Sequence, residues 1–122
     1  PLEITCHDPD AGYTVGRINQ NEFHLPFSNY SPGETVFITI RPEDIALAIL
    51  PISGISIQNQ IPGVITGISQ VGRRVLVQAD IGIEILSEVT LKTLKNFGLK
   101  EGNTIYCMIK THSISYLGSR VE

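Results

Sequence analysis

The sequence lacks the clustered basic residues and the long apolar runs that mark two large classes of protein. Its formal net charge is -3 at pH 7, and its lysines and arginines are scattered along the chain, so we expect no binding to nucleic acid. No apolar run is long enough to span a membrane and no signal peptide is visible, so nothing in the sequence points to insertion or export.

Cysteines and catalytic motifs are also scarce. Cys6 and Cys107 form no Cys-x-x-Cys pair, and no Cys/His spacing is typical of a zinc site. We expect two free thiols, one of them in the core, with a bridge between them as the less favoured alternative. The phosphate-loop pattern G-x-x-x-x-G-K-[ST] is absent, and no histidine has a nearby Ser or Cys arrangement typical of a nucleophile and base. We therefore predict no catalytic residues and no metal site in this chain.

The strongest positive signal is an alternation of apolar and other residues with a period of two. Short runs of this kind, separated by clusters of Gly, Pro, Asn and Asp, are typical of antiparallel β-structure in a small barrel or sandwich. The sequence predicts strands near 2–6, 12–18, 22–27, 35–41, 45–50, 61–70, 73–80, 83–89 and 104–116.

One segment has a helical period instead. Leu91, Leu94 and Phe97 recur at three-residue intervals, Thr90 can cap the first turn and Gly98 can end the last. The pattern predicts a short helix near 91–97. Its apolar stripe favours closing the open end of a barrel over binding a partner, because such stripes usually face a core.

The segment "LPISGI" (50–55) looks like a joint between two halves. We predict a first β lobe over residues 1–54 and a second over residues 55–122, each about the size of a small five-stranded barrel. Either half is small for independent stability, so we expect the halves to pack together or to depend on a second copy of the chain.

Two groups of polar residues are candidates for a binding site. One lies where a strand begins, and the other lies on the last predicted strand in the phrase "KTHS". Hydroxyls, amides and one ammonium group suit a small tetrahedral dianion. Ordinary turn chemistry explains the same residue types, and from residue types alone it is the favoured interpretation. The residues are Ser56, Gln58, Asn59, Lys110, Thr111 and Ser113.

The order of three phrases adds a family resemblance. "GETVFITIRPEDIALA" (33–48), "SIQNQIPGVITGI" (56–68) and "LSEVTLKTLKNFGLKEGNTIYCMIKTHSISYL" (86–117) together resemble the C-terminal part of importer ATPases of the ATP-binding cassette class. The chain is most similar to the subunit that powers molybdate or tungstate uptake. Its second half resembles the molybdate-binding fold of oligonucleotide-barrel type. The resemblance implies a mostly β fold with two small oligonucleotide-barrel-like lobes of antiparallel strands and one short helix.

The resemblance also implies an oxyanion site. The family uses a Ser-x-Arg-Asn phrase, which Ser56 and Asn59 match while Gln58 replaces the Arg, and a Lys followed by a small residue, which Lys110 and Thr111 match with Ser113 nearby. The replacement removes a full charge and a bidentate fork. Since a hydrogen bond to a charged group contributes roughly 1.5–3 kcal/mol, we expect affinity to fall about tenfold to a hundredfold.

The function implied is that of a regulatory domain, with no cofactor of its own and with molybdate or tungstate as candidate ligand. ATP and magnesium would bind an upstream nucleotide-binding domain. The expected partners are a second copy of the chain and transmembrane permease subunits, which would place the protein in the cytoplasm on the inner face of the cell membrane. Two alternatives stay open: a ligand-free dimerisation domain of a sugar, polyamine, iron or sulfate importer ATPase, and a molybdate storage or sensor protein.

Overall fold

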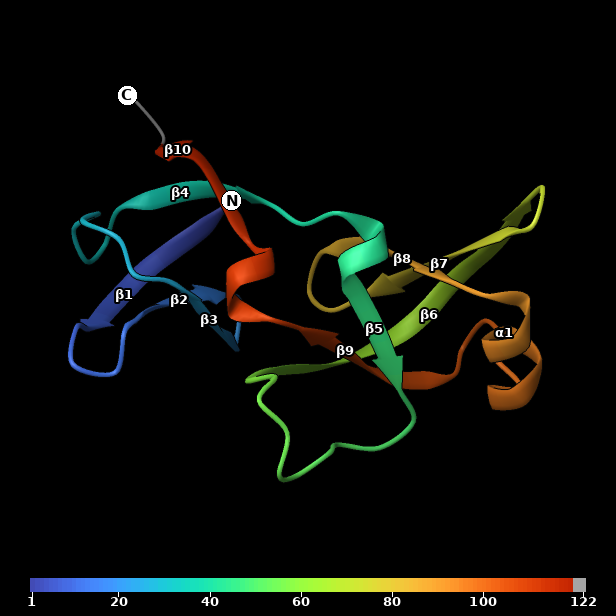
Figure 1. Cartoon of the computed structure of the whole chain (residues 1–122). Helices are drawn as coiled ribbons and strands as arrows, with labels where there is room; N and C mark the ends of the chain where they lie inside the picture. Colours follow the sequence, from blue (N-terminus) through green and yellow to red (C-terminus); the bar gives the residue numbers. More distant parts are fainter. Residues whose placement is uncertain (120–122) are drawn as a thin grey trace.

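The computed structural model describes residues 1–119, which form two five-stranded antiparallel sheets (Figure 1). The first sheet has the order β10-β4-β1-β2-β3, and the second has the order β5-β9-β6-β7-β8. The strands of the first sheet are β1 (Leu2–Asp8), β2 (Tyr13–Ile18), β3 (Asn21–Pro26), β4 (Thr35–Thr39) and β10 (Ser115–Ser119). Those of the second are β5 (Ile45–Ala48), β6 (Asn59–Val71), β7 (Arg74–Asp80), β8 (Glu84–Val89) and β9 (Thr104–Ile109). The predicted mostly β architecture is confirmed.

The strand expected over 104–116 is wrong in its extent. β9 ends at Ile109, a 3-10 turn η2 (Thr111–Ser113) follows, and β10 then pairs with β4 in the other sheet. The turn forms because the N–H of Ser113 donates to the carbonyl of Lys110 at 3.0 Å, and the N–H of Ile114 donates to that of Thr111 at 3.2 Å. A second 3-10 turn, η1 (Pro42–Asp44), similarly separates β4 from β5.

The sheets do not divide at residue 54, where the joint was expected. The chain passes from the first sheet to the second at η1 and returns at η2, so β5 belongs to the second sheet and β10 to the first. The segment 49–58 is a loop that connects β5 to β6 within the second sheet (Figure 1). As a domain boundary, the division into 1–54 and 55–122 stays a prediction.

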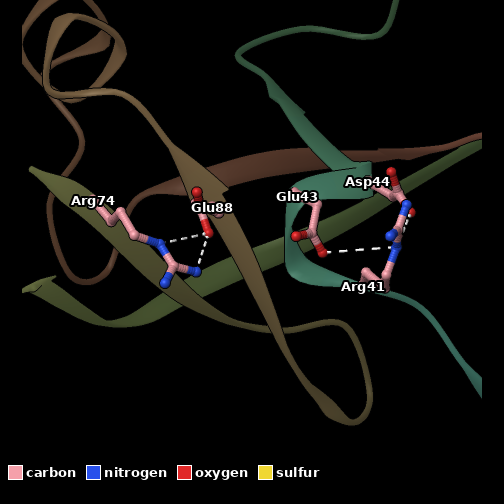
Figure 2. Close-up of polar contacts among 5 residues, drawn as sticks. All are labelled: Arg41, Glu43, Asp44, Arg74 and Glu88. Carbon is pink, nitrogen blue, oxygen red and sulfur yellow. Dashed lines mark hydrogen bonds and ion pairs between the residues drawn. The ribbon is translucent and has the colours of Figure 1, made fainter.

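The second sheet curls so that its edge strands β5 and β8 lie against each other. At this seam the buried hydroxyl of Ser87 donates to the backbone carbonyl of Ile45 at 2.6 Å. On the outer face, Nε of Arg74 on β7 donates to Oε1 of Glu88 on β8 at 3.0 Å (Figure 2). The sheet therefore closes through a side-chain contact where no strand ladder joins its edges.

The predicted helix is confirmed as α1 (Leu91–Phe97). The hydroxyl of Thr90 accepts the N–H of Thr93 at 3.2 Å, and Gly98 ends the helix in the left-handed conformation with a φ of 60°. Leu91 and Leu94 pack against the hydrophobic core, whereas Phe97 is 38% exposed. Two of the three stripe residues thus face the core. Among residues 1–119, no helix is long and apolar enough to cross a membrane.

A single hydrophobic cluster joins both sheets. Its members include Leu2 and Phe23 from the first sheet and Val75 and Ile105 from the second. Cys107 is also buried in this cluster, while Cys6 is exposed, and both thiols are free. The expectation of two free cysteines with one in the core is confirmed. Because the core is shared, the two sheets hold a fixed relation at the junction where the candidate site lies.

Candidate functional site

A polar cavity of about 300 Å³ lies where the two sheets meet. Three segments far apart in the sequence line it: the turn between β1 and β2 with the first residue of β2, the end of the loop before β6, and the segment after β9 that includes η2. The lining residues are Ala11, Gly12, Tyr13, Ser56, Gln58, Lys110, Thr111 and His112. Four of the six predicted oxyanion residues are therefore brought to one cavity: Ser56, Gln58, Lys110 and Thr111.

Strand pairing explains why the two polar phrases meet. β6 and β9 are antiparallel neighbours, with Asn59 opposite Ile109. The residues just before β6 therefore lie beside the residues just after β9, which places Gln58 next to the segment that begins at Lys110. Both polar phrases therefore lie at the same end of the β6–β9 pair. Their distance apart in the sequence gives no indication of this.

The β1–β2 turn contributes the wall that sequence reasoning missed. The side-chain carboxylate of Asp8 accepts a hydrogen bond from the N–H of Ala11 at 3.1 Å, and the backbone carbonyl of Asp8 accepts one from the N–H of Gly12 at 2.8 Å. Gly12 has a φ of 85°, which favours glycine. Asp8-Pro9 is a dipeptide typical of turns, but such a local signal says nothing about which distant segment the turn contacts.

Asn59 follows Gln58 in the sequence but does not line the cavity, and its side-chain amide is hydrogen-bonded elsewhere. Its side chain is 2% exposed; its Oδ1 accepts the backbone N–H of His24 at 2.7 Å, and its Nδ2 donates to the carbonyl of His24 at 2.9 Å. These bonds tie the start of β6 to the free edge of β3. As a direct oxyanion ligand, Asn59 stays a prediction.

Gln58 also contacts His24, through side chains. Its Oε1 lies 2.6 Å from Nδ1 of the imidazole. The imidazole in turn stacks on Tyr13, with ring centroids 4.4 Å apart and an interplanar angle of 8°. His24 thus contacts two residues of the cavity lining, Tyr13 and Gln58, without lining the cavity itself.

Ser113, the sixth predicted residue, lines a neighbouring polar cavity of about 410 Å³. That cavity also contains Arg41, whose Nε lies 3.0 Å from Asp44 and 3.8 Å from Glu43 (Figure 2). Since both carboxylates neutralise Arg41, it does not supply the charge that Gln58 lacks. His112 lines both cavities.

The chemistry of the first cavity is that of a hydrogen-bond donor site with one cation. Lys110 is the permanently charged residue in its lining, and no carboxylate lines it among the described residues. Within residues 1–119, no group of three or more His, Cys, Asp or Glu side chains is placed to hold a metal ion. The lining can therefore accept a small anion through an ammonium, two hydroxyls and an amide.

Sequence comparison finds similar proteins that are named for molybdenum or molybdate import. The molybdenum import ATP-binding protein ModC of Rhizobium etli is 31% identical over an alignment of 115 residues, which covers 90% of this chain and 32% of that protein. The molybdate/tungstate import ATP-binding protein WtpC of Pyrococcus abyssi is 35% identical over 80 residues, or 65% of this chain and 23% of that protein. The chain thus spans about a third of the length of its ModC relative.

Structural comparison agrees about the fold. The cytoplasmic molybdate-binding protein ModG, in a crystal form with molybdate bound, superposes with a TM-score of 0.83 at 18% identity, over 94% of this chain and 91% of that chain. The predicted oligonucleotide-barrel-like fold is therefore confirmed, as is the resemblance to the ATP-binding subunit of molybdate and tungstate importers. The TOBE domain family matches residues 55–115, which is half of the chain. This chain belongs to the TOBE domain family.

Proposed function

We propose that this chain is the regulatory domain of an importer ATPase of the ATP-binding cassette class. We also propose that the cavity lined by Ser56, Gln58, Lys110 and Thr111 binds molybdate or tungstate. The observation that carries the proposal is the convergence of Ser56, Gln58, Lys110 and Thr111 on one cavity. The relatives named for molybdenum import and for molybdate binding support the choice of oxyanion.

The lining residues have the chemistry that a tetrahedral dianion requires. The ammonium of Lys110 offsets part of the charge, and the hydroxyls of Ser56 and Thr111 can donate to separate oxygens. The amide of Gln58 supplies N–H donors in place of the guanidinium that the family phrase carries. Such charge-assisted hydrogen bonds are short and strong, so a few of them can hold the ion without a full set of countercharges.

The volume of the cavity bears on the proposed homodimer. A cavity of about 300 Å³ corresponds to roughly ten water molecules at about 30 Å³ each, so a single tetrahedral ion fills only part of it. In our proposal a second copy of the chain covers the remainder. Oxyanion binding would then favour one arrangement of the dimer, which is how a bound ligand can inhibit transport.

The remaining elements of the proposal concern the whole protein. The ATP-binding relatives support an upstream domain that binds ATP and magnesium, transmembrane permease partners, and a location in the cytoplasm on the inner face of the membrane. Feedback regulation by cytoplasmic oxyanion is the role that this arrangement would allow.

One observation favours a second candidate function. The ModG structure matches this chain over nearly the full length of both chains. A free-standing protein that stores or senses molybdate is therefore the alternative. The two functions share the cavity and differ in whether an ATPase domain responds to it.

Calorimetric titration of the chain with molybdate, tungstate and sulfate tests the ligand. We expect heat and a raised melting temperature with molybdate and tungstate. Lys110→Met should weaken binding about tenfold to a hundredfold, because it removes one charge-assisted hydrogen bond worth roughly 1.5–3 kcal/mol. Lys92→Met, at an exposed position on α1, is the matched control and should bind as the wild type does.

Two outcomes of this titration would count against the proposal. Absence of heat and of any thermal shift at millimolar oxyanion rejects the ligand, and equal losses in both lysine variants reject the cavity as its site. ATP hydrolysis by the full transporter then separates the two functions: inhibition by molybdate supports regulation, and a rate independent of molybdate favours storage.

A further inference from the structure

We infer that His24 is a positioning residue for the oxyanion cavity: its ring sets the direction of the Gln58 amide and so determines whether Gln58 presents donors to an anion. The inference rests on the proposed function, since it concerns the same cavity. His24 belongs to neither polar phrase of the sequence and does not line the cavity itself.

The need for a positioning residue follows from the chemistry of glutamine. An arginine presents only N–H donors, so it can meet an anion in any orientation of its fork. A glutamine has a donor end and an acceptor end of nearly equal size. Turned one way Gln58 binds an anion, and turned the other way its oxygen repels it.

The contact with His24 separates these two states. Gln58 Oε1 can only accept, so its 2.6 Å contact with Nδ1 requires a proton on Nδ1. In that state Gln58 Nε2, with its two N–H groups, is the end of the amide turned away from His24, and Gln58 lines the cavity. If Nδ1 loses its proton to the other ring nitrogen, the amide must turn to donate to Nδ1, and its oxygen then faces the cavity.

The imidazole is held in place independently of Gln58. One face stacks on Tyr13, with centroids 4.4 Å apart. The backbone N–H and carbonyl of His24 are both bonded to the amide of Asn59. The ring is thus preset where it meets residue 58, so the protonated nitrogen, rather than ring movement, selects the direction of the amide.

A pair of substitutions at position 24 tests this role with tungstate as the probe. His24→Phe keeps a flat ring that can stack on Tyr13 but removes the donor that orients the amide. The amide of Gln58 then samples both directions, and we expect tungstate affinity to fall about twofold, in proportion to the competent fraction. His24→Asn places an amide close to the position of Nδ1 that can offer either an N–H or a carbonyl, so we expect it to leave the direction of the Gln58 amide unset and to recover little of that loss. Both variants keep the backbone groups that Asn59 contacts.

A double variant distinguishes positioning from general damage. In a Gln58→Arg background the residue at 58 has no acceptor end to orient, so adding His24→Phe should cost little or no affinity. A loss as large as in the Gln58 background would overturn the inference, because it would mean that the ring supports the cavity in some other way.

The nitrogen chemical shifts of His24 provide a readout that a merely structural role would not move. With tungstate bound, we expect the signature of a proton on Nδ1. A ring protonated only at Nε2 with tungstate bound, or a His24→Phe variant that binds as the wild type does, overturns the inference and leaves the proposed function standing. A wild-type chain that binds no tungstate overturns both.

Discussion

The side-chain amide of Asn59 pairs with both backbone groups of His24, accepting the N–H at 2.7 Å and donating to the carbonyl at 2.9 Å. In this way a residue of β6 in the second sheet occupies the free edge of β3 in the first, as a neighbouring strand would. Edge groups of this kind otherwise need water or another chain. The contact also fixes the backbone of His24, which places its ring beside Gln58.

Replacing Asn59 should therefore destabilise the protein. Asn59→Ala leaves the N–H and carbonyl of His24 without these partners, and we expect a loss of about 1–3 kcal/mol in the free energy of unfolding. Asn59→Asp should cost more, because it removes the donor and places a charge at a buried position. Urea denaturation measures both, with Asn96→Asp at an exposed position as the control. A fully stable Asn59→Asp protein would show that this contact does not hold the junction.

Gln58→Arg should strengthen oxyanion binding. The substitution restores the charge and the five donors of the family phrase, and we expect tungstate affinity to rise about tenfold to a hundredfold. Calorimetric titration measures the change. Gln70→Arg adds the same charge at an exposed position of β6 outside the cavity lining, and it should leave affinity unchanged. Equal gains in the two variants would indicate a general effect of net charge.

Ser87→Ala should weaken the closure of the second sheet. The buried hydroxyl of Ser87 donates to the carbonyl of Ile45, and its removal leaves that acceptor without this partner. We expect a loss of about 1–3 kcal/mol in the free energy of unfolding. The control is Ser69→Ala, at an exposed position of β6, which should change stability little. Similar values for both variants in urea denaturation would contradict the proposed importance of the seam.

Cys107 should make stability fall at alkaline pH. Burial raises the pKa of its thiol from 9.0 to about 12. Between these values the unfolded chain has lost the proton and the folded chain retains it, so the stability present below about pH 9 is lost as pH rises toward 12. The expected slope is at most about 1.4 kcal/mol per pH unit.

Denaturation between pH 8 and about pH 10.5 measures this slope. Cys107→Ala should flatten it, whereas Cys6→Ala, at the exposed thiol, should not. An unchanged slope in Cys107→Ala would assign the alkaline loss to another group. Tyr116, whose pKa is also raised by burial, is the candidate that the structure offers.

The local elements were predictable because their signals lie within a few residues of one another. Alternation along segments such as 74–80 indicated strands, since every second side chain faces the same side of a sheet. Thr90 and Gly98 marked the ends of α1 through contacts that span a single helical turn. The polar phrases at 56–59 and 110–113 were recognisable because the family resemblance gave them an order, although residue types alone favoured turns.

The sequence by itself determined the β class, the helix and the identity of the polar phrases. Tertiary structure decided which residues meet: β10 crosses into the first sheet, Ser113 lines a second cavity, and His24 reaches Gln58 from the edge of β3. These contacts join segments far apart in the chain, and no local periodicity encodes them. They depend on how two sheets pack around one shared core, which is a property of the whole chain.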